Sequence, residues 1–205
     1  MDDTRHGSGK FTYANGDWYD GEWDFGKAHG TGTFWTRQSK YIGRWDQDLK
    51  HGVGEERFED GGVYNGEYKK GYRSGKGTYT FADGSVYEGE FVNNNQEGHG
   101  EATWKKGHSY VGQWENNYMH GSGRYTWADG SSYEGQYVSN LKDGDGVFTT
   151  KHGRRIDCKW ADGRLYGPVA ITAAEWDAPV THWRGGVMLS WAAASDDGLG
   201  TPVDE

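Results

Sequence analysis

The chain has 205 residues, of which 33% are aliphatic, aromatic or cysteine, and this composition alone leans toward disorder. Eleven Trp, 14 Tyr and 7 Phe are too many for a solvated coil, and 35 glycines without a Gly-X-Y triplet exclude collagen. The net charge of −9 argues against a nucleic-acid-binding protein, which needs clustered Lys and Arg, and the single cysteine excludes an internal disulfide framework.

The first ten residues, MDDTRHGSGK, lack the apolar core of a signal peptide. No apolar run approaches the ~20 residues of a membrane-spanning helix. We therefore expect a soluble cytoplasmic protein, for which a membrane-surface role is disfavoured by the acidic net charge.

The predicted elements repeat every 23 residues, and the first repeat is one residue shorter. Counting from an opening tyrosine as position 1, position 3 is glycine, position 5 is aromatic, and positions 12 and 14 are glycines. A half-repeat covers residues 6–18, and the full repeats begin at Tyr19, Tyr41, Tyr64, Tyr87, Tyr110 and Tyr133. A fixed period of this size predicts a stacked array in which each unit is stabilised by its neighbours.

Within each repeat, apolar or glycine positions alternate with polar ones, which predicts strands with one buried face. The Asn-Gly and Asp-Gly pairs before four of the opening tyrosines, Asn15-Gly16, Asp60-Gly61, Asp83-Gly84 and Asp129-Gly130, favour tight hairpin turns. Positions 6–11 then form a longer polar connection. The sequence predicts an all-β fold, an elongated single-layer antiparallel meander of about seven or eight 23-residue β-hairpins.

The period of two places every repeated aromatic residue and every repeated strand glycine on the same face of the sheet. Because glycine has no Cβ, a neighbouring ring can lie flat over its backbone. A one-layer sheet leaves such a face partly open, which predicts a partner-binding groove. The predicted groove residues are Tyr19, Trp23, Tyr41, Trp45, Tyr64, Tyr68, Tyr87, Phe91, Tyr110, Trp114, Tyr133, Tyr137, Trp104 and Trp127. The predicted structural glycines are Gly66, Gly75, Gly77, Gly89, Gly98, Gly100, Gly112, Gly121 and Gly123.

Beyond the regular array of residues 1–153, the register continues but larger apolar residues replace the glycines. Ile156 and Cys158 occupy positions 1 and 3, and Val169 occupies position 14. We predict that residues 154–191 are degenerate repeats that cap the array and cover its open edge. The alternative is a mating surface for another subunit. Residues 192–205 are predicted to be a disordered acidic tail.

The candidate catalytic and metal-binding residues all have a simpler structural interpretation. Histidines at position 11 recur roughly 10 Å apart, too far to share a zinc ion. They are His6, His29, His51 and His120. The carboxylates at position 4 point away from the ring face, where no cleft is predicted. They are Glu22, Glu67 and Glu90. Cys158 should be a buried, inert thiol. We expect no catalytic residue, no metal and no cofactor.

The pattern Tyr-x-Gly-[Glu/Gln]-aromatic followed by Gly-x-Gly, aromatic residues and a turn glycine resembles the MORN repeat (membrane occupation and recognition nexus). The resemblance covers residues 6–153 closely and 154–183 loosely. It implies an elongated single-layer β-sheet with an aromatic groove on one face. MORN arrays occur in radial-spoke-head proteins, junctophilins, plant lipid kinases, protozoan scaffolds and adaptors for myosin tails. The arrays themselves are not catalytic.

The resemblance leads to three hypotheses about function. The first is a non-enzymatic scaffold that holds a helix or extended segment of a partner protein, within a cytoskeletal assembly of a cilium or flagellum similar to the radial spoke. A second copy of the chain is the alternative occupant. The second hypothesis is a peripheral module for phosphoinositides, which needs a cluster of cations. Two candidate groups exist, Lys69, Lys70, Arg73 and Lys76, and Lys151, Arg154 and Arg155. The third, an enzyme, would need a further domain that this sequence does not contain.

The face assignment makes a first testable prediction. Gly112→Val should destabilise the protein by a few kcal/mol, because its side chain would displace a ring. Gln113→Ala, one residue further on the opposite face, should be near neutral. Urea denaturation of the two variants compares their free energies of unfolding, and equal effects would contradict the face assignment.

Overall fold

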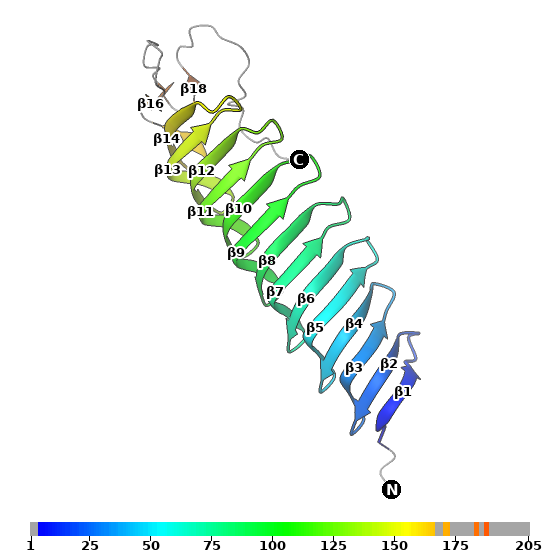
Figure 1. The fold of residues 1–205 in the computed structure, drawn as a ribbon. Helices are drawn as coiled ribbons and strands as arrows, with labels where there is room; N and C mark the ends of the chain where they lie inside the picture. The colour runs from blue at the N-terminus through cyan, green and yellow to red at the C-terminus, as the bar shows by residue number, and fades with distance from the viewer. Residues whose placement is uncertain (1–3, 167–169, 173–182, 185–186, 189–205) are drawn as a thin grey trace. The chain divides into compact units, whose positions relative to one another are not determined.

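The computed structural model of the protein describes residues 4–166, 170–172, 183–184 and 187–188. These residues form strands and turns, and among them there is no helix that could cross a membrane. The chain divides into two compact units, residues 1–119 and 120–205 (Figure 1). An all-β antiparallel meander of hairpins was predicted, and the strand order within each unit confirms it.

The first unit is a single-layer meander in which each strand pairs with the next one in the chain (Figure 1). Its strands are β1 (Gly7–Thr12), β2 (Trp18–Asp24), β3 (Lys27–Trp35), β4 (Ser39–Asp46), β5 (Leu49–Phe58), β6 (Val63–Lys69), β7 (Tyr72–Thr80), β8 (Val86–Val92), β9 (Asn95–Thr103) and β10 (Ser109–Glu115). Glycines at positions 3 and 14 lie opposite each other in these ladders, as Gly66 lies opposite Gly77.

The second unit continues the same pattern. Its strands are β11 (Tyr118–Thr126), which begins at the last two residues of the first unit, β12 (Ser132–Val138), β13 (Leu141–Thr149), β14 (Arg155–Ala161), β15 (Arg164–Leu165) and β16 (Ala170–Thr172). β14 pairs with β13 on one side and with both β15 and β16 on the other. A separate pair consists of β17 (Trp183–Arg184) and β18 (Val187–Met188).

The predicted C-terminal cap lies partly outside the described residues. Ile156, Cys158 and Leu165 are buried, at 4–8% exposure, so larger side chains do fill this end of the second unit. Val169 and most of the remaining stretch up to residue 191 lie outside the described residues, as does the predicted tail, residues 192–205. The sealing role of residues 154–191 stays a prediction.

The two kinds of connection are the reverse of those predicted. The tight two-residue turns lie at positions 7 and 8, where both residues have positive φ, for example Asn93 (φ 49°) and Asn94 (φ 74°). Turns of this kind need positive φ at both central residues, and their twist matches that of the flanking strands. The Asp-Gly pairs instead lie in five-residue connections: Phe81 N donates to Ser85 O at 2.8 Å, and only Gly84 has a positive φ, of 90°. Asp83 accepts a hydrogen bond from Ser85 N, which holds it outside the left-handed region.

Each tight turn is hydrogen-bonded to the preceding repeat. Asn94 N donates to Arg73 O at 3.0 Å, and Asn94 Oδ1 accepts from Arg73 N at 2.9 Å. Asn117 makes the same two bonds with Gln96, at 3.1 and 2.8 Å. Asp48 makes them with Ala28. Where position 8 is Asp48, Asn94 or Asn117, its side chain therefore joins neighbouring hairpins at the turn ends of the strands.

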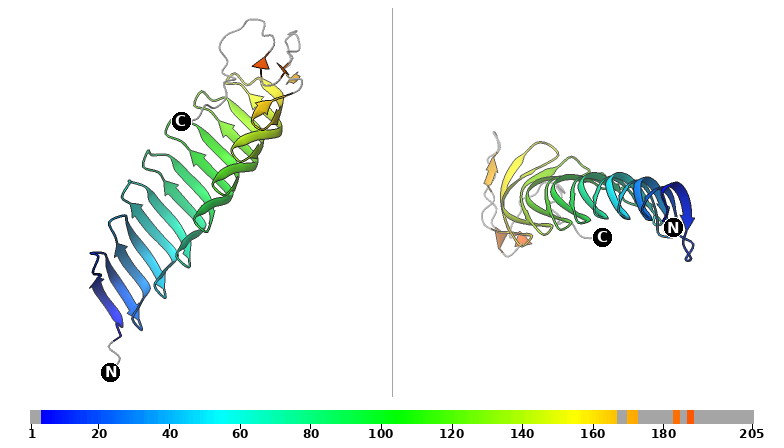
Figure 2. Two further views of the ribbon diagram at one scale, coloured as in Figure 1. Left: turned by 180° about the vertical axis from the view of Figure 1, so that it is seen from behind. Right: turned by 90° about the horizontal axis from the view of Figure 1, so that it is seen from below.

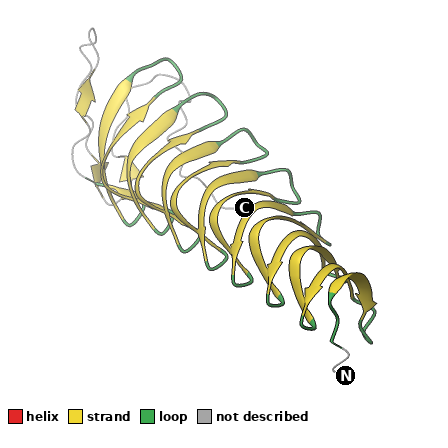
Figure 3. Cartoon of the chain, turned by 60° about the horizontal axis from the view of Figure 1, so that its bottom comes forward, coloured by secondary structure: helices red, strands yellow, loops and turns green. Residues whose placement is uncertain are grey.

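A β-bulge interrupts the ladder inside the repeats. The register of β2 with β3 shifts after Gly21, and that of β8 with β9 shifts after Gly89. Bulges bend a strand and increase its twist. The strands of each unit are accordingly strongly curved, as Figures 2 and 3 show.

The bulge also corrects the predicted role of the position-12 glycines. Gly75 (φ 88°) and Gly98 (φ 64°) are left-handed, and Gly121 has the same conformation (φ 56°). A Cβ at Gly98 would lie 2.6 Å from the Glu90 carboxylate, not beneath a ring. Our placement of Gly75 and Gly98 on the ring face was wrong, because a left-handed residue turns its Cβ direction toward the other face.

The hydrogen bonds of the tight turns generate the second prediction. Asn94→Ala should destabilise the protein by about 1–3 kcal/mol, since it removes the acceptor for Arg73 N and places alanine at positive φ. Asn94→Asp should change the free energy of unfolding by less than about 1 kcal/mol, because Asp48 already occupies the equivalent position. Urea denaturation at neutral pH measures both. Equal losses in the two variants would show that the acceptor contributes nothing.

Candidate functional site

The position-1 tyrosines lie over bare backbone, as predicted. All six, Tyr19, Tyr41, Tyr64, Tyr87, Tyr110 and Tyr133, are at most 1% exposed. A Cβ added to Gly54 would lie 2.5 Å from the Tyr41 ring, and one added to Gly77 would lie 2.6 Å from Tyr64 Cζ. Gly66, Gly89 and Gly100 lie beneath rings in the same way. Gly112 pairs with Gly100 and Gly123 with Gly135, in the same two rows of glycines.

Five of these six tyrosines, all but Tyr133, donate their hydroxyl to the backbone carbonyl at position 4, beside the bulge. Tyr64 Oη donates to Glu67 O at 3.0 Å, and Tyr41 Oη donates to Arg44 O at 2.9 Å. Burial raises the pKa of Tyr64 to about 12, an effect that the nearby Arg73 charge opposes. The hydroxyl therefore stays protonated at neutral pH and remains a donor.

The position-5 rings fill the spaces between successive tyrosines. Tyr87 meets Phe91 of its own repeat at 5.2 Å between ring centroids and Trp114 of the next repeat at 5.1 Å, both edge to face. Each such pair of rings contributes about 0.5–1.5 kcal/mol to stability, in addition to the effect of burying their apolar surface. Trp23, Trp45, Tyr68, Phe91, Trp114 and Tyr137 are 2–8% exposed. The twelve predicted groove residues at positions 1 and 5 thus form the core, and little of their surface is free to touch a partner.

Most aromatic residues at positions 16 and 18 remain accessible beside this core. We call the accessible ones the 16/18 strip: Phe11, Tyr13, Phe34, Phe58, Tyr79, Phe81 and Trp104 in the first unit, and Tyr125 and Trp127 in the second, where Phe148 is instead buried at 5% exposure. Tyr13 is 40% and Phe81 42% exposed, whereas Trp104 and Trp127 are half-buried. Neighbouring members pack against each other: the ring centroid of Tyr79 lies 4.6 Å from that of Phe81 and 5.8 Å from that of Phe58. Of the fourteen predicted groove residues, only Trp104 and Trp127 belong to this strip.

Cations at position 10 lie over the buried rings, an arrangement that the sequence did not predict although Arg73 was named in a candidate cation group. Arg73 Cζ lies 5.6 Å from the Tyr64 ring centroid and 5.1 Å from that of Tyr79. In the second unit, Lys142 Nζ lies 4.8 Å from Tyr133 and 4.4 Å from Trp160. Burial lowers the pKa of Lys142 to about 8. Position 10 holds alanine, glutamine or methionine in other repeats, so the sequence carries no repeated signal there.

One repeat of the first unit carries a buried carboxylate where others carry a position-16 ring. Glu56 is 6% exposed and accepts from Lys50 Nζ at 2.5 Å, Ser39 Oγ at 2.7 Å and Tyr68 Oη at 2.9 Å. Burial pushes the pKa of Glu56 up, but the Lys50 charge and these three donors outweigh burial and hold it below 4.5. The ring face is therefore interrupted by one fully hydrogen-bonded polar cluster.

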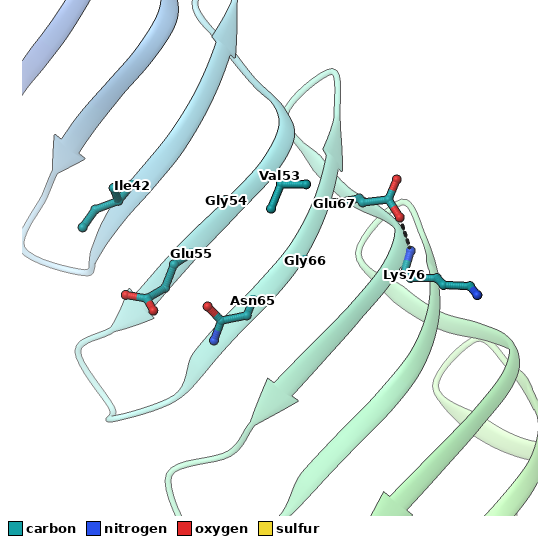
Figure 4. A pocket seen from close by; sticks show the side chains of 8 residues that line it. All are labelled: Ile42, Val53, Gly54, Glu55, Asn65, Gly66, Glu67 and Lys76. Atoms are coloured by element: carbon teal, nitrogen blue, oxygen red, sulfur yellow. Dashed lines mark hydrogen bonds between the residues drawn. The ribbon is translucent and has the colours of Figure 1, made fainter.

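The face opposite the rings holds the position-4 carboxylates and a shallow depression. Glu22 Oε1 accepts from Thr31 N at 2.8 Å and from Thr31 Oγ1 at 2.6 Å, bonds that lower the Glu22 pKa. Glu67 accepts from Lys76 N at 3.0 Å. Both carboxylates thus support the bulge. Figure 4 shows Glu67 and Lys76 at one end of the depression, which Ile42, Val53, Glu55 and Asn65 also line.

The histidine and cysteine positions offer no assembled chemistry. His6 lies 3.3 Å from Asp24, and His29 lies 3.6 Å from Asp46, each as a separate exposed pair. Among the described residues, no three His, Cys, Asp or Glu side chains are grouped so that they could hold a metal. Cys158 is buried, and burial raises its thiol pKa, which suits the predicted structural role.

The repeats of this chain match a known protein family. The model of the MORN repeat matches seven segments, residues 1–18, 19–39, 41–63, 64–86, 87–109, 110–132 and 133–151. No curated protein matches the sequence.

Several solved structures are similar at low identity. The TCP domain of SAS-4 (dCPAP) from Drosophila melanogaster, in complex with a proline-rich motif of Ana2 (dSTIL), is 11% identical over 82% of this chain and 90% of that one, with a TM-score of 0.39. The TCP10 domain of Danio rerio CPAP is 15% identical over 80% and 88%, with a TM-score of 0.30. The G-box domain of the microcephaly protein CPAP is 12% identical over 82% and 100%, with a TM-score of 0.33. With TM-scores below 0.5, these likenesses support no conclusion about what this chain binds.

The Glu56 cluster generates the third prediction. Glu56→Ala should destabilise the protein by about 2–4 kcal/mol at pH 7, because it leaves Lys50 and Tyr68 without their acceptor. Glu55→Ala, which removes only a surface pair with Arg57, should cost less than about 1 kcal/mol. Thermal or urea unfolding of the three proteins measures these differences.

The pH dependence tests the charge of this carboxylate separately. Because the folded-state pKa of Glu56 lies below its ordinary value of 4.5, its stabilisation is present above pH 4.5 and is lost as the pH falls through the folded-state pKa. The stability gap between wild type and Glu56→Ala should therefore narrow below about pH 4.5. A gap that is constant from pH 7 to pH 3 would show that the charge is unimportant.

Proposed function

Because the chain belongs to the MORN-repeat family, with seven matched segments between residues 1 and 151, we propose that it is a non-enzymatic scaffold or adaptor that binds a partner protein along its ring face. The observation that supports this role most is the 16/18 strip. Rings such as Phe81 stay accessible although the core aromatics beside them are at most 8% exposed. Exposed apolar strips of this kind mark binding surfaces.

The chemistry beside the strip indicates what the partner carries. Arg73 lies 5.1 Å from the Tyr79 ring, and Tyr79 touches Phe81. A helix or extended segment would place apolar anchors against these rings and acidic groups near Arg73. The partly buried cation favours such a pair because it is only weakly solvated. This is the partner class that we propose for the first unit.

A non-enzymatic role fits the titratable groups on the ring face of the first unit. The tyrosines are buried donors whose raised pKa values keep them protonated, and Glu56 is held ionised by three donors. General acid–base catalysis needs a group whose pKa lies near the working pH and that can reach a substrate. The groups on this face instead hold strands and bulges together.

The cellular setting is a finer proposal. We place the scaffold in a cytoskeletal assembly of a cilium or flagellum, because array-only MORN proteins resemble this chain and occur in radial spoke heads. Its test is fractionation of flagella followed by salt extraction of axonemes. The proposal expects the chain in the axonemal fraction, and its recovery only with soluble or vesicle fractions would contradict it.

The phosphoinositide alternative loses support from the placement of its cations. Lys69 and Lys70 are exposed near the tip of a tight turn, but Arg73 lies on the ring face and Lys76 on the opposite face near Glu67. The first of the two candidate groups is therefore not one patch in space. Salt-sensitive co-sedimentation with anionic vesicles would nevertheless overturn our ranking of the two functions.

Site-specific photo-crosslinking tests the ring-face proposal and is the fourth prediction. A photoreactive phenylalanine at Phe81 (42% exposed) should cross-link a partner protein in a native extract, since this residue belongs to the strip. The same group at Val92, which is 50% exposed on the opposite face, should yield little product. The cross-linked proteins are identified by mass spectrometry.

Two outcomes of this experiment would contradict the proposal. Equal cross-linking from the two positions would show that the ring face is not selective. Cross-linking of Phe81 only to another copy of the chain would assign the face to self-association instead.

A further inference from the structure

The outer edge of β1 is not covered by any strand of the described residues. β1 lies at the end of the strand order, and among the described residues only β2 pairs with it (Figure 1). Five of its six residues are exposed, and the sixth, Phe11, is half-buried. The pairing with β2 is regular over all six residues, and β1 contains no proline. Such an edge presents unpaired N–H and C=O groups to any strand that fits it.

The repeat pattern indicates which kind of strand would pair with the outer edge of β1. Gly7, Gly9 and Phe11 occupy positions 12, 14 and 16, so β1 corresponds to β3, β5, β7 and β9. Each of those strands pairs on both sides, and on one side its neighbour is a position-1-to-5 strand of the same repeat, as β6 is for β7. Among the described residues, β1 has no such neighbour.

No tyrosine ring of the described residues lies over the backbone of Gly9. No heavy atom lies within 4 Å of a Cβ built on Gly9, whereas the equivalent atoms on Gly54 and Gly100 lie 2.5 Å from Tyr41 and Tyr87. Gly9 is otherwise an ordinary member of its row, since its carbonyl accepts from Trp23 Nε1 at 2.8 Å. The bare backbone that receives a ring elsewhere is therefore present here without its ring.

The ring contacts of Arg5 also lack one member that the equivalent arginine, Arg73, has. At position 10, Arg73 lies near three rings, those of Tyr64 (5.6 Å), Tyr79 (5.1 Å) and Phe91 (5.8 Å). Arg5 lies over the counterparts of the last two, Phe11 at 3.6 Å and Trp23 at 4.9 Å. The ring that corresponds to Tyr64 is the one that a position-1 tyrosine would supply.

The backbone at this edge already has the bulge conformation. Gly7 is left-handed, with φ 81°, like Gly30 with φ 61°. Gly30 lies in the bulge between β2 and β3, and the next residue, Thr31, donates its N–H to the position-4 carboxylate of Glu22 at 2.8 Å. Ser8 corresponds to Thr31, so its N–H is placed for a glutamate at position 4 of an added strand. The edge is thus formed for a tyrosine, a glycine and a glutamate at successive defined positions.

We propose that the outer edge of β1 takes up an extended segment of a partner protein with the pattern Tyr-x-Gly-Glu-aromatic, which adds as an antiparallel strand. The tyrosine covers Gly9 and completes the ring set around Arg5, and the glutamate accepts from Ser8 N–H. A second copy of this chain is a poor donor, because its own strands of this pattern, such as β4, β6 and β8, are paired on both edges. The site adjoins the 16/18 strip at Phe11, but it does not depend on whether the rest of the strip binds a partner.

A peptide with the sequence of β8, acetyl-VYEGEFV-amide, is a probe with the required pattern. Added to the full chain, it should protect β1 amides, Ser8 included, in hydrogen exchange or NMR titration, with saturation. Replacing its tyrosine by alanine should weaken binding by about tenfold or more, because one buried ring is lost. Binding of the two peptides with equal affinity would overturn the proposal.

Two protein variants serve as a matched pair. Gly9→Val covers the backbone on which the ring would lie and should lower peptide affinity by about tenfold or more, while its thermal unfolding stays near that of wild type because a Cβ there meets nothing. Ser8→Val adds the same side chain on the opposite face and should bind within about threefold of wild type. Equal affinities of Gly9→Val and wild type would overturn the proposal. Protection of β1 that rises with chain concentration alone would also overturn it, by assigning the edge to a second copy.

Discussion

The fold depends on one constraint: a sheet one layer thick can bury only one of its faces, and it must do so with its own side chains. Aromatic rings laid over glycine backbone meet this requirement, because the missing Cβ lets the ring approach until almost no water-accessible surface remains. Tyr64 over Gly66 and Gly77 is one such unit, with its hydroxyl bonded to the Glu67 carbonyl. Position-5 rings then join successive units edge to face. Without bare backbone at positions 3 and 14, the rings could not lie flat.

Much of this was predictable because residue parity fixes the face of a strand. The alternation from Tyr64 to Tyr68 and the glycine rows predicted strands with one ring-bearing face, and the MORN resemblance agreed. The turns were not predictable from Asp-Gly pairs, because the tight turns use dissimilar pairs such as Phe25-Gly26, Gln47-Asp48 and Asn93-Asn94. The alternation of residues assigns each side chain to a face of the sheet, but it does not say how deeply that side chain is buried. It therefore could not distinguish fully covered Tyr87 from partly exposed Phe81, nor foresee that a left-handed Gly98 faces the other way.

Along each repeat, the positions that form the buried core differ from those that stay accessible. Positions 1, 3, 5 and 14 build the core and keep the same residue class in the six regular repeats, whereas positions 10, 16 and 18 vary between repeats. That variation places Arg73 beside an aromatic pair, Glu56 in a polar cluster, and Lys142 over three rings of the second unit. An array built in this way can carry a different local chemistry on each hairpin while its backbone stays the same. This is a property suited to a scaffold, and the outer edge of β1 extends it to the end of the first unit.

The most direct test of the central claim is a double-mutant cycle on Tyr64 and Gly77, with free energies of unfolding measured in urea. A Cβ on Gly77 meets only atoms of Tyr64 among its three nearest neighbours. Gly77→Ala should therefore cost several kcal/mol in the wild-type background and far less in the Tyr64→Ala background, which gives a coupling energy of about 1–3 kcal/mol. If the two substitutions are instead additive within about 0.5 kcal/mol, the ring does not depend on the bare backbone beneath it, and the account is wrong.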